Sequence, residues 1–393
     1  MKACKKTLRV ALVGVSGYAH WHYNMLIALA DAGRITLRAC VIINQEEESA
    51  RCEKLESMGS RLYGDFDQML AEEGSELDLC CIPTGIRLHR SMTIAALDRD
   101  MHVLVEKPAA GSLEEVRQMQ VARDRSGRQV FVGFQNMYAD DLLHVKDLLV
   151  SRMLGAILRI KVQVCWPRPE SYYTRNDWAG RLVVAGCPVF DSPANNAMAH
   201  FIMMALFWAG PTRSTMAAWS DLEAHLYRSQ EIESFDTLSA KLRTQSGAEI
   251  LWNMTHSSSE LLRPEIVVEC ERGAIIWRED EGGRVCFTED STEPDIVFDP
   301  FPETRQVMFR KVVNVVTGSG EFVCDLDMAS SHTRFIEELH RISRIQQVCG
   351  DRILERMEEG KSYRYVSGLT EMIRSAHATG TLLPQISSPS LVR

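Results

Sequence analysis

The chain has 393 residues, of which 45% are hydrophobic and 25% are charged, with a formal net charge of -9. This ordinary globular composition predicts two or three domains, and the negative charge provides no basic surface for nucleic acid. No apolar run is long enough for a membrane span or a secretion signal, and the 11 cysteines form no C-x-x-C pair. We therefore expect a cytoplasmic protein with reduced thiols and no metal site.

The first third of the chain alternates between strand and helix patterns. Strands are expected at residues 8–13, 35–43, 77–82, 103–105 and 129–134, and helices at 20–32, 48–58, 91–98 and 113–123. This alternation predicts an α/β domain with a doubly wound parallel sheet, a Rossmann domain, over residues 1–134.

A glycine-containing turn joins the first expected strand to the first expected helix. It consists of Gly14, Ser16, Gly17, Tyr18 and Ala19 with Val15 between them, in the context typical of a dinucleotide-binding turn. Gly14 suits the tight turn, and Ser16 replaces the second glycine of the motif. Gly17 lets the backbone approach a ligand, and Ala19 is small enough for helix–strand packing. The helix N-terminus would face a pyrophosphate.

The second expected strand leads to Asn44, where an acidic residue commonly binds the adenosine ribose. Asn44 can still hydrogen-bond a ribose hydroxyl, or it can simply open a turn. Glutamates follow it, and no arginine occurs before Arg51. A ribose 2′-phosphate would meet negative charge there, so the sequence favours NAD over NADP.

A short stretch, Glu106-Lys107-Pro108, closes a strand that is apolar on both faces. Pro108 ends the strand, because proline cannot donate to a sheet ladder. Glu106 and Lys107 therefore lie at the carboxyl end of a central strand, the edge where open α/β sheets bind ligands. A lysine there can hydrogen-bond a substrate hydroxyl. The alternative is an ordinary surface ion pair.

From residue 135 the pattern changes to strands linked by turns. Helices are expected at 140–152, 193–208, 335–348 and 365–379, and strands at 156–166 and near 214–220, 236–244, 248–255, 264–270 and 273–278. Residues 135–393 are therefore predicted to form an α+β domain with an open, mostly antiparallel sheet that binds substrate and mediates oligomerisation.

Taken in order, these motifs resemble the glucose–fructose oxidoreductase / inositol dehydrogenase / MocA family. The resemblance extends through Thr84, His89, Gly133-Phe134-Gln135-Asn136 and Gly186-x-Pro188-Val189-x-Asp191. It implies hydride transfer between NAD and a secondary alcohol of a sugar, sugar derivative or cyclitol, in a homodimer or homotetramer. It also implies that Lys107 contacts both the reacting oxygen and the cofactor, and that Asp191 orients the substrate. The residues expected beside the nicotinamide and its ribose are Thr84, His89, Glu106 and Gln135. His89 has the alternative of being a plain helix-start residue.

The chain departs from the family at Asn195, which stands where the family has a histidine. An amide does not titrate, so Asn195 is expected to donate a hydrogen bond to substrate and cannot be a general base. Ser192 and Pro193 are typical of a helix start. On that helix Asn196 and His200 would share a face. Asn196 is a candidate for substrate binding and His200 a candidate catalytic residue, although His200 would point away from Asn195; the alternative is a buried histidine paired with Asn196 or with the backbone.

The segment from Trp166 to Trp178 is rich in aromatic and polar side chains. Arg168, Tyr172, Asn176 and Trp178 are candidates for sugar recognition, because sugars bind flat rings and planar polar groups. Weaker candidates for the same cleft are Thr255-His256 and residues 231–236. The alternative is a subunit contact.

Two other functions are also compatible with the sequence. One is a glycoside-cleaving enzyme that uses tightly held NAD for a transient oxidation. The other is a non-catalytic protein that senses NAD or a sugar, which the replacement by Asn195 would suit.

Overall fold

The computed structural model describes residues 7–288, 296–299 and 303–386. It divides into two compact units, Met1–Tyr138 with Glu303–Ser330, and Ala139–Pro302 with Ser331–Arg393. The first unit therefore takes back a late segment of the chain, whereas the sequence predicted a single division near residue 134. No described helix is long and apolar enough to cross a membrane.

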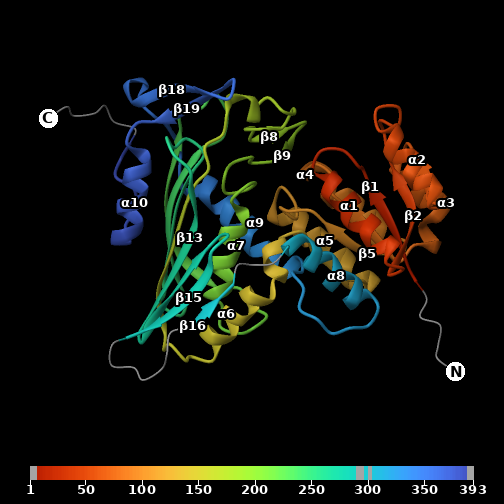
Figure 1. Cartoon of the computed structure of the whole chain (residues 1–393), viewed down its shortest axis with the longest axis horizontal. Coiled ribbons are helices and arrows are strands. Elements are labelled where there is room, and N and C mark those ends of the chain that lie inside the picture. Colours follow the sequence, from red (N-terminus) through yellow and green to blue (C-terminus); the bar gives the residue numbers. More distant parts are fainter. Residues whose placement is uncertain (1–6, 289–295, 300–302, 387–393) are drawn as a thin grey trace. The chain divides into compact units, whose positions relative to one another are not determined.

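The first unit is built on a six-stranded parallel sheet, as predicted (Figure 1). Its strands lie in the order β3-β2-β1-β4-β5-β6, which places the switch in connection direction at β1 and β4. The strands are β1 (Leu8–Val13), β2 (Ile35–Val41), β3 (Arg61–Tyr63), β4 (Leu79–Ile82), β5 (His102–Val105) and β6 (Val130–Val132). The helices are α1 (Ala19–Asp31), α2 (Ser49–Ser57), α3 (Phe66–Glu73), α4 (Ile86–Leu97) and α5 (Leu113–Ser126), with 3₁₀ turns Gly74–Glu76 and Gln135–Tyr138.

The returning segment completes the edge of this sheet. It contains α8 (Thr304–Val316) and the start of α9 (Leu326–Ile342). Before α9, Asp325 forms an antiparallel bridge with Phe131, and the amide of Val132 donates to the carbonyl of Cys324 at 2.8 Å. The hydroxyl of Tyr138 also donates to Cys324 O, at 3.2 Å. The edge strand β6 is thus covered by residues nearly two hundred positions later.

The second unit is built on a nine-stranded sheet in the order β16-β15-β14-β13-β7-β12-β11-β10-β17. Its neighbouring strands pair antiparallel except β7 with β12 and β10 with β17, as the expected mostly antiparallel sheet requires. The strands are β7 (Ile157–Cys165), β10 (Trp219–Arg228), β11 (Thr237–Thr244), β12 (Glu249–Thr255), β13 (Leu262–Cys270), β14 (Gly273–Arg278), β15 (Gly282–Phe287), β16 (Ile296–Phe298) and β17 (Ile345–Gln347).

Helices cover both faces of this sheet (Figure 1). On one face, α7 (Ala199–Trp208) is fully buried, and Phe335 of α9 lies 4.9 Å from the ring of Trp252. On the other face, α10 (Leu369–Thr379) forms an apolar cluster with Cys165 and Tyr227. The remaining elements are α6 (Asp140–Val150), the ribbons β8 (Val183–Val184) with β9 (Cys187–Pro188) and β18 (Ile353–Glu358) with β19 (Lys361–Val366), and 3₁₀ turns Glu170–Tyr172 and Gly350–Arg352.

A buried lysine joins two of these helices. Lys146 of α6 has no exposed surface, and its Nζ donates to the carbonyls of Phe207, of Gly210 at 2.7 Å and of Thr215 at 3.5 Å. These carbonyls lie at and just beyond the C-terminus of α7, where a helix leaves acceptors unpaired. Lys146 therefore closes the end of α7 from a neighbouring helix.

Several predicted boundaries were wrong where tertiary contacts outweigh local signals. The strand expected near 214–220 begins only at Trp219. The helix expected at 335–348 ends at Ile342, because residues 345–347 pair with β10. The helix expected at 365–379 begins at Leu369, after Gly368 adopts a left-handed conformation (φ 73°).

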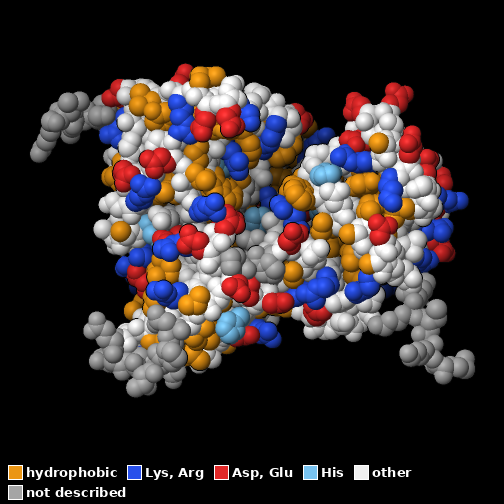
Figure 2. All heavy atoms as spheres, in the orientation of Figure 1, with side chains coloured by type: hydrophobic (Ala, Val, Ile, Leu, Met, Phe, Trp, Pro, Cys, Tyr) orange, Lys and Arg blue, Asp and Glu red, His pale blue; other side chains and the backbone are white. Residues whose placement is uncertain are grey.

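Charged side chains of both signs are interspersed on the molecular face that Figure 2 shows, without an extended patch of one sign. The described cysteines are all free, and most are buried.

Candidate active site

The glycine turn after β1 has the backbone shape that the sequence predicted. Gly14 and Gly17 have φ values of 87° and 56°, a left-handed region that favours glycine. The amide of Gly14 donates to Val41 O at 2.8 Å, which ties the turn to β2. A side chain placed at Gly17 would find no atom within 4 Å, so the backbone is open just before α1. Tyr18, 39% exposed, lies at the same opening.

Side chains from the end of β2 and from α2 fold back onto this turn. Ser16 Oγ donates to Glu48 Oε1 at 2.7 Å, and Asn44 Nδ2 lies 3.3 Å from Ser16 Oγ. Arg51 pairs with Glu48 and donates to Val15 O at 3.1 Å. Arg51 was expected to lie too far along the chain to act at this turn, but the first turn of α2 brings it to the glycine turn beside Glu48.

His89 connects the ends of two parallel strands. Its Nδ1 lies 2.9 Å from Pro108 O and its Nε2 lies 3.0 Å from Thr84 O. The ring is 1% exposed, and burial lowers its pKa. His89 thus holds the loops after β4 and β5 together from within α4, a helix that starts at Ile86, five residues earlier than predicted.

Two polar atoms at the carboxyl edge of this sheet are buried without a hydrogen-bond partner among the described residues. They are Thr84 Oγ1, after β4, and Gln135 Oε1, after β6. Buried polar atoms are nearly always paired in native proteins. Two such atoms at the edge that holds the open glycine turn fit a polar ligand, and a dinucleotide supplies ribose hydroxyls and a carboxamide for them.

The backbone of Lys107 is held by Glu106, whose carboxylate is buried and in contact with a histidine. The carboxylate of Glu106 is 4% exposed, and its Oε1 lies 2.8 Å from His22 Nε2. Its Oε2 accepts the amide N–H of Lys107 at 3.0 Å. A side chain on Gly133 would lie 2.6 Å from Glu106 Oε1, so any larger residue there would displace the Glu106 carboxylate. Both oxygens of Glu106 are therefore engaged within the fold.

His22 was not singled out in the sequence. It lies on α1 three residues after Ala19, on the buried side of the helix, with Phe309 of α8 packed edge-on at 4.9 Å. One signal could have suggested the contact between His22 and Glu106. The sequence places a histidine on the buried side of the first helix and a glutamate at the end of a buried strand.

In the second unit, Asp191 is held by three neighbours. It is 3% exposed and accepts hydrogen bonds from the amide of Gly180 at 2.7 Å and from Asn196 Nδ2 at 2.9 Å. Arg175 Nη2 lies 3.9 Å from its Oδ2. The donors fix the orientation of the Asp191 carboxylate.

The helix predicted from Pro193 was wrong in its first turn, since residues 193–198 form turns and α7 begins at Ala199. Ser192 does cap this segment, because its Oγ accepts the amide of Asn195 at 3.2 Å. Asn195 Nδ2 donates to Val189 O at 2.9 Å, so one amide N–H is used within the fold. His200 and Asn196 do not share a helix face, because Asn196 precedes α7.

The aromatic segment after β7 gathers around Tyr172. The guanidinium carbons of Arg175 and Arg168 lie 3.7 Å and 5.0 Å from its ring centre. Arg175 also lies 5.0 Å from the ring of Trp178. Asn176 differs from the other candidates, because its Oδ1 accepts the amides of Trp178 and Ala179 and so shapes the turn.

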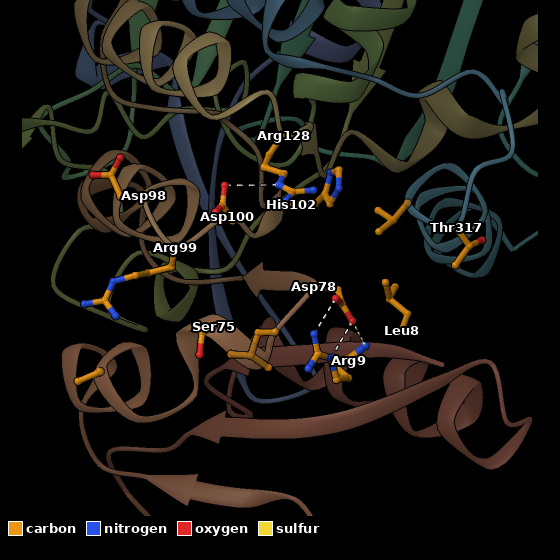
Figure 3. A pocket seen from close by; sticks show the side chains of 13 residues that line it. Leu8, Arg9, Ser75, Asp78, Asp98, Arg99, Asp100, His102, Arg128 and Thr317 are labelled. Carbon is orange, nitrogen blue, oxygen red and sulfur yellow. Dashed lines mark hydrogen bonds and ion pairs between the residues drawn. The ribbon is translucent and has the colours of Figure 1, made fainter. Parts of the chain in front are cut away.

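A cavity of about 760 Å³ opens at the opposite, amino-terminal edge of the parallel sheet (Figure 3). Two oppositely charged pairs line it, Arg9 with Asp78 and Arg128 with Asp100. It contains none of the residues that the sequence singled out. Ligands of open α/β sheets bind at the other edge, so we do not assign the active site to this cavity.

Comparison with protein families settles the class. The family model for the oxidoreductase family with an NAD-binding Rossmann fold (GFO_IDH_MocA) matches residues 8–134, and the model of the GFO/IDH/MocA C-terminal domain matches residues 142–276. The chain belongs to the Gfo/Idh/MocA family. Its first unit is accordingly an NAD-binding Rossmann domain.

Relatives of this Gfo/Idh/MocA protein include named dehydrogenases. Glucose-6-phosphate 3-dehydrogenase of Bacillus subtilis is 28% identical over 154 residues, 39% of this chain and 41% of that protein. Inositol 2-dehydrogenase of Salmonella typhimurium is 23% identical over 155 residues, 39% of this chain and 45% of that protein. The matched stretch therefore spans less than half the length of these relatives.

The fold is that of solved family members. The WlbA dehydrogenase of Bordetella pertussis, solved with NADH and UDP-GlcNAcA, superposes with a TM-score of 0.69 at 23% identity. The match covers 86% of this chain and 96% of that one.

Proposed function

We propose that this protein is an NAD-dependent dehydrogenase or reductase that acts on a secondary alcohol of a sugar, sugar derivative or cyclitol. The observation that carries the proposal is a pair of buried oxygens, of Thr84 and Gln135, that find no partner among the described residues and lie at the same sheet edge as Lys107 and the open glycine turn. When bound, NAD accepts or donates the hydride. We also propose that the protein forms a homodimer or homotetramer and is located in the cytoplasm.

Lys107 is the proposed group on the reacting oxygen. An ammonium has three donors and no acceptor, so it can hold an alcohol or carbonyl oxygen and stabilise negative charge that develops on it. The hydrogen bond from its backbone to Glu106, itself paired with His22, fixes where the side chain begins. Such support is what a positioned proton-transfer group requires.

Asp191 is the second proposed catalytic residue, with Asn195 and Asn196 as supporting groups. Asn196 holds the carboxylate of Asp191, so we assign it as a positioning residue. Asn195 cannot titrate, and one of its N–H groups already binds Val189 O. The proton is therefore expected to leave through Lys107 and Asp191. We assign His200 no proton-transfer step.

The cofactor preference is expected to be NADH over NADPH, through Glu48. This carboxylate accepts from Ser16 and pairs with Arg51 at the glycine turn, where a 2′-phosphate would meet it. Glu48→Gln removes the negative charge and frees Arg51, so NADPH affinity should rise about tenfold, the scale of a like-charge penalty. Fluorescence titration with both cofactors measures this change. Glu53→Gln, exposed on the same helix, is the matched control. Unchanged NADPH affinity in Glu48→Gln would show that Glu48 does not determine the preference for NADH over NADPH.

The reaction itself is tested by a panel of sugars, cyclitols and glycosides assayed in two ways. Absorbance of NADH reports net oxidation or reduction, and product analysis detects bond cleavage without net redox change. We expect NADH formation with at least one sugar or cyclitol. Glycoside cleavage without net NADH would replace the proposal with transient-oxidation chemistry. Sugar binding without any turnover would replace it with a sensing role.

A further inference from the structure

Two buried nitrogen atoms of the second unit lack a hydrogen-bond partner within the described part of the chain. They are Arg168 Nε and His256 Nε2. Arg168 follows β7, and His256 follows β12. These two strands are parallel neighbours, and their last residues pair with each other. The amide of Arg168 donates to His256 O at 3.1 Å. Their side chains both contact Tyr172, whose ring centre lies 5.0 Å from the Arg168 guanidinium carbon and 5.5 Å from the His256 ring.

Both nitrogens are hydrogen-bond donors. The Nε of arginine always carries a hydrogen. His256 is 1% exposed, and burial together with Arg168 and Arg175 lowers its pKa well below the usual range, so its ring carries one proton. We assign the ring proton to Nε2, with the Tyr173 hydroxyl, 3.4 Å from Nδ1, as a donor to Nδ1. Two adjacent donors therefore lack an acceptor.

The positive charge of Arg168 is also not neutralised by contact. No carboxylate of the described residues lies within 4 Å of its guanidinium, which instead lies 5.7 Å from the ring of Trp166 and 5.0 Å from that of Tyr172. Aromatic faces of this kind hold a guanidinium in place without satisfying its charge.

The nearest buried carboxylates are committed to other donors. Asp191 accepts from Gly180 and Asn196. Asp236 accepts hydrogen bonds from the amides of Ser229 and Gln230 and from nearby hydroxyls. The cluster around Tyr172 therefore holds one arginine, Arg175, beside Asp191 and a second one, Arg168, that is unpaired.

We propose that Arg168 and His256 bind an anionic group of the substrate, a carboxylate or a phosphate ester. The substrate would then be a sugar acid or a sugar phosphate, and neutral sugars and cyclitols would be poor substrates. This inference rests on the proposed function, which places sugar recognition in this segment. The planar fork of arginine suits both oxyanions, and the neighbouring rings of Trp166 and Tyr172 help to hold its orientation.

The kinetic test compares matched substrates in the full chain with NAD. Glucose 6-phosphate and glucuronic acid are the two anionic arms, and glucose and methyl glucoside are the neutral ones. We expect kcat/KM for one anionic arm to exceed that for the neutral sugars about 10- to 100-fold, the scale of hydrogen bonds to a charged group. Arg168→Gln should abolish this preference mainly through KM, and Arg168→Lys should restore part of it. Arg213→Gln, an exposed arginine that pairs with Asp147, is the control.

Binding provides a second measurement that does not depend on turnover. Intrinsic tryptophan fluorescence, to which Trp166 and Trp178 beside the proposed site contribute, is followed while glucose 6-phosphate, glucuronic acid, inorganic phosphate or glucose is added. Binding of an anionic sugar that Arg168→Gln weakens at least tenfold supports the inference. Equal affinity of wild type and Arg168→Gln for every probe overturns it. Turnover of neutral sugars without any preference for anionic ones also overturns the inference but leaves the proposed function intact. If anionic sugars bind but no substrate is turned over, only the proposed function is contradicted.

Discussion

Replacement of Lys107 by alanine is expected to lower kcat by at least about 100-fold, the low end of what a positioned proton-transfer group contributes. The loss should appear in kcat, because Lys107 is proposed to stabilise charge on the reacting oxygen in the transition state. NADH should still bind, since the glycine turn and the polar atoms of Thr84 and Gln135 are unchanged. Steady-state kinetics and NADH titration together measure both quantities.

Two further variants sharpen this test. Lys107→Arg keeps the charge but replaces a compact ammonium by a planar fork, so it should recover little activity. Lys54→Ala removes an exposed lysine on α2 and should leave kinetics unchanged. Full turnover by Lys107→Ala would disprove the assignment. If the variant loses both NADH binding and turnover, Lys107 acts in cofactor binding and not in the chemical step.

Replacement of Lys146 by methionine is expected to lower the free energy of unfolding by about 2–4 kcal/mol. Methionine fills most of the space but leaves the carbonyls of Phe207 and Gly210 buried without a donor, and each unpaired group costs about 1–3 kcal/mol. Chemical denaturation monitored by circular dichroism measures the change. Lys54→Met is the matched control, because the same substitution on an exposed side chain should change stability by less than about 0.5 kcal/mol.

The contribution of Lys146 should also depend on pH. Burial lowers its pKa to about 7, below its ordinary value of 10.5. Between these values the unfolded chain binds a proton that the folded chain does not, so the stability contributed by this group rises as the pH increases from 7 toward 10. The difference in unfolding free energy between wild type and Lys146→Met should therefore grow over that range. A constant or shrinking difference would contradict this pKa.

Local patterns were enough to predict the elements that place the cofactor. Continuous apolar runs such as Val103–Val105 and the glycine turn encode strand, turn and helix within a few neighbouring residues, and the parallel sheet follows from their alternation. The same holds for Ser192, whose capping hydrogen bond forms as its position suggested. The helix that was expected to follow did not begin there, because residues 193–198 are held as turns by contacts such as His332 Nε2 to Ala194 O at 2.9 Å.

Contacts between distant parts of the chain could not be predicted in this way. His22 and Glu106 are 84 positions apart, and no local signal links them. Arg51 was judged by its distance from Asn44 in sequence, whereas α2 brings it back to the glycine turn. The pairing of β7 with β12 places His256 beside Tyr172, although more than 80 residues separate them. Such contacts depend on sheet order, which a single sequence does not specify.

The return of residues 303–330 to the first unit has a consequence for any attempt to separate the two parts. A gene fragment that stops after residue 138 would encode a cofactor domain without Cys324, Asp325 and Phe309. The backbone of β6 would then be an open edge, which invites strand-to-strand association between molecules, and the ring of His22 would lose its aromatic neighbour. Residues 139–302 of the second unit therefore interrupt the first, so the cofactor domain becomes complete only after residue 330 has been synthesised.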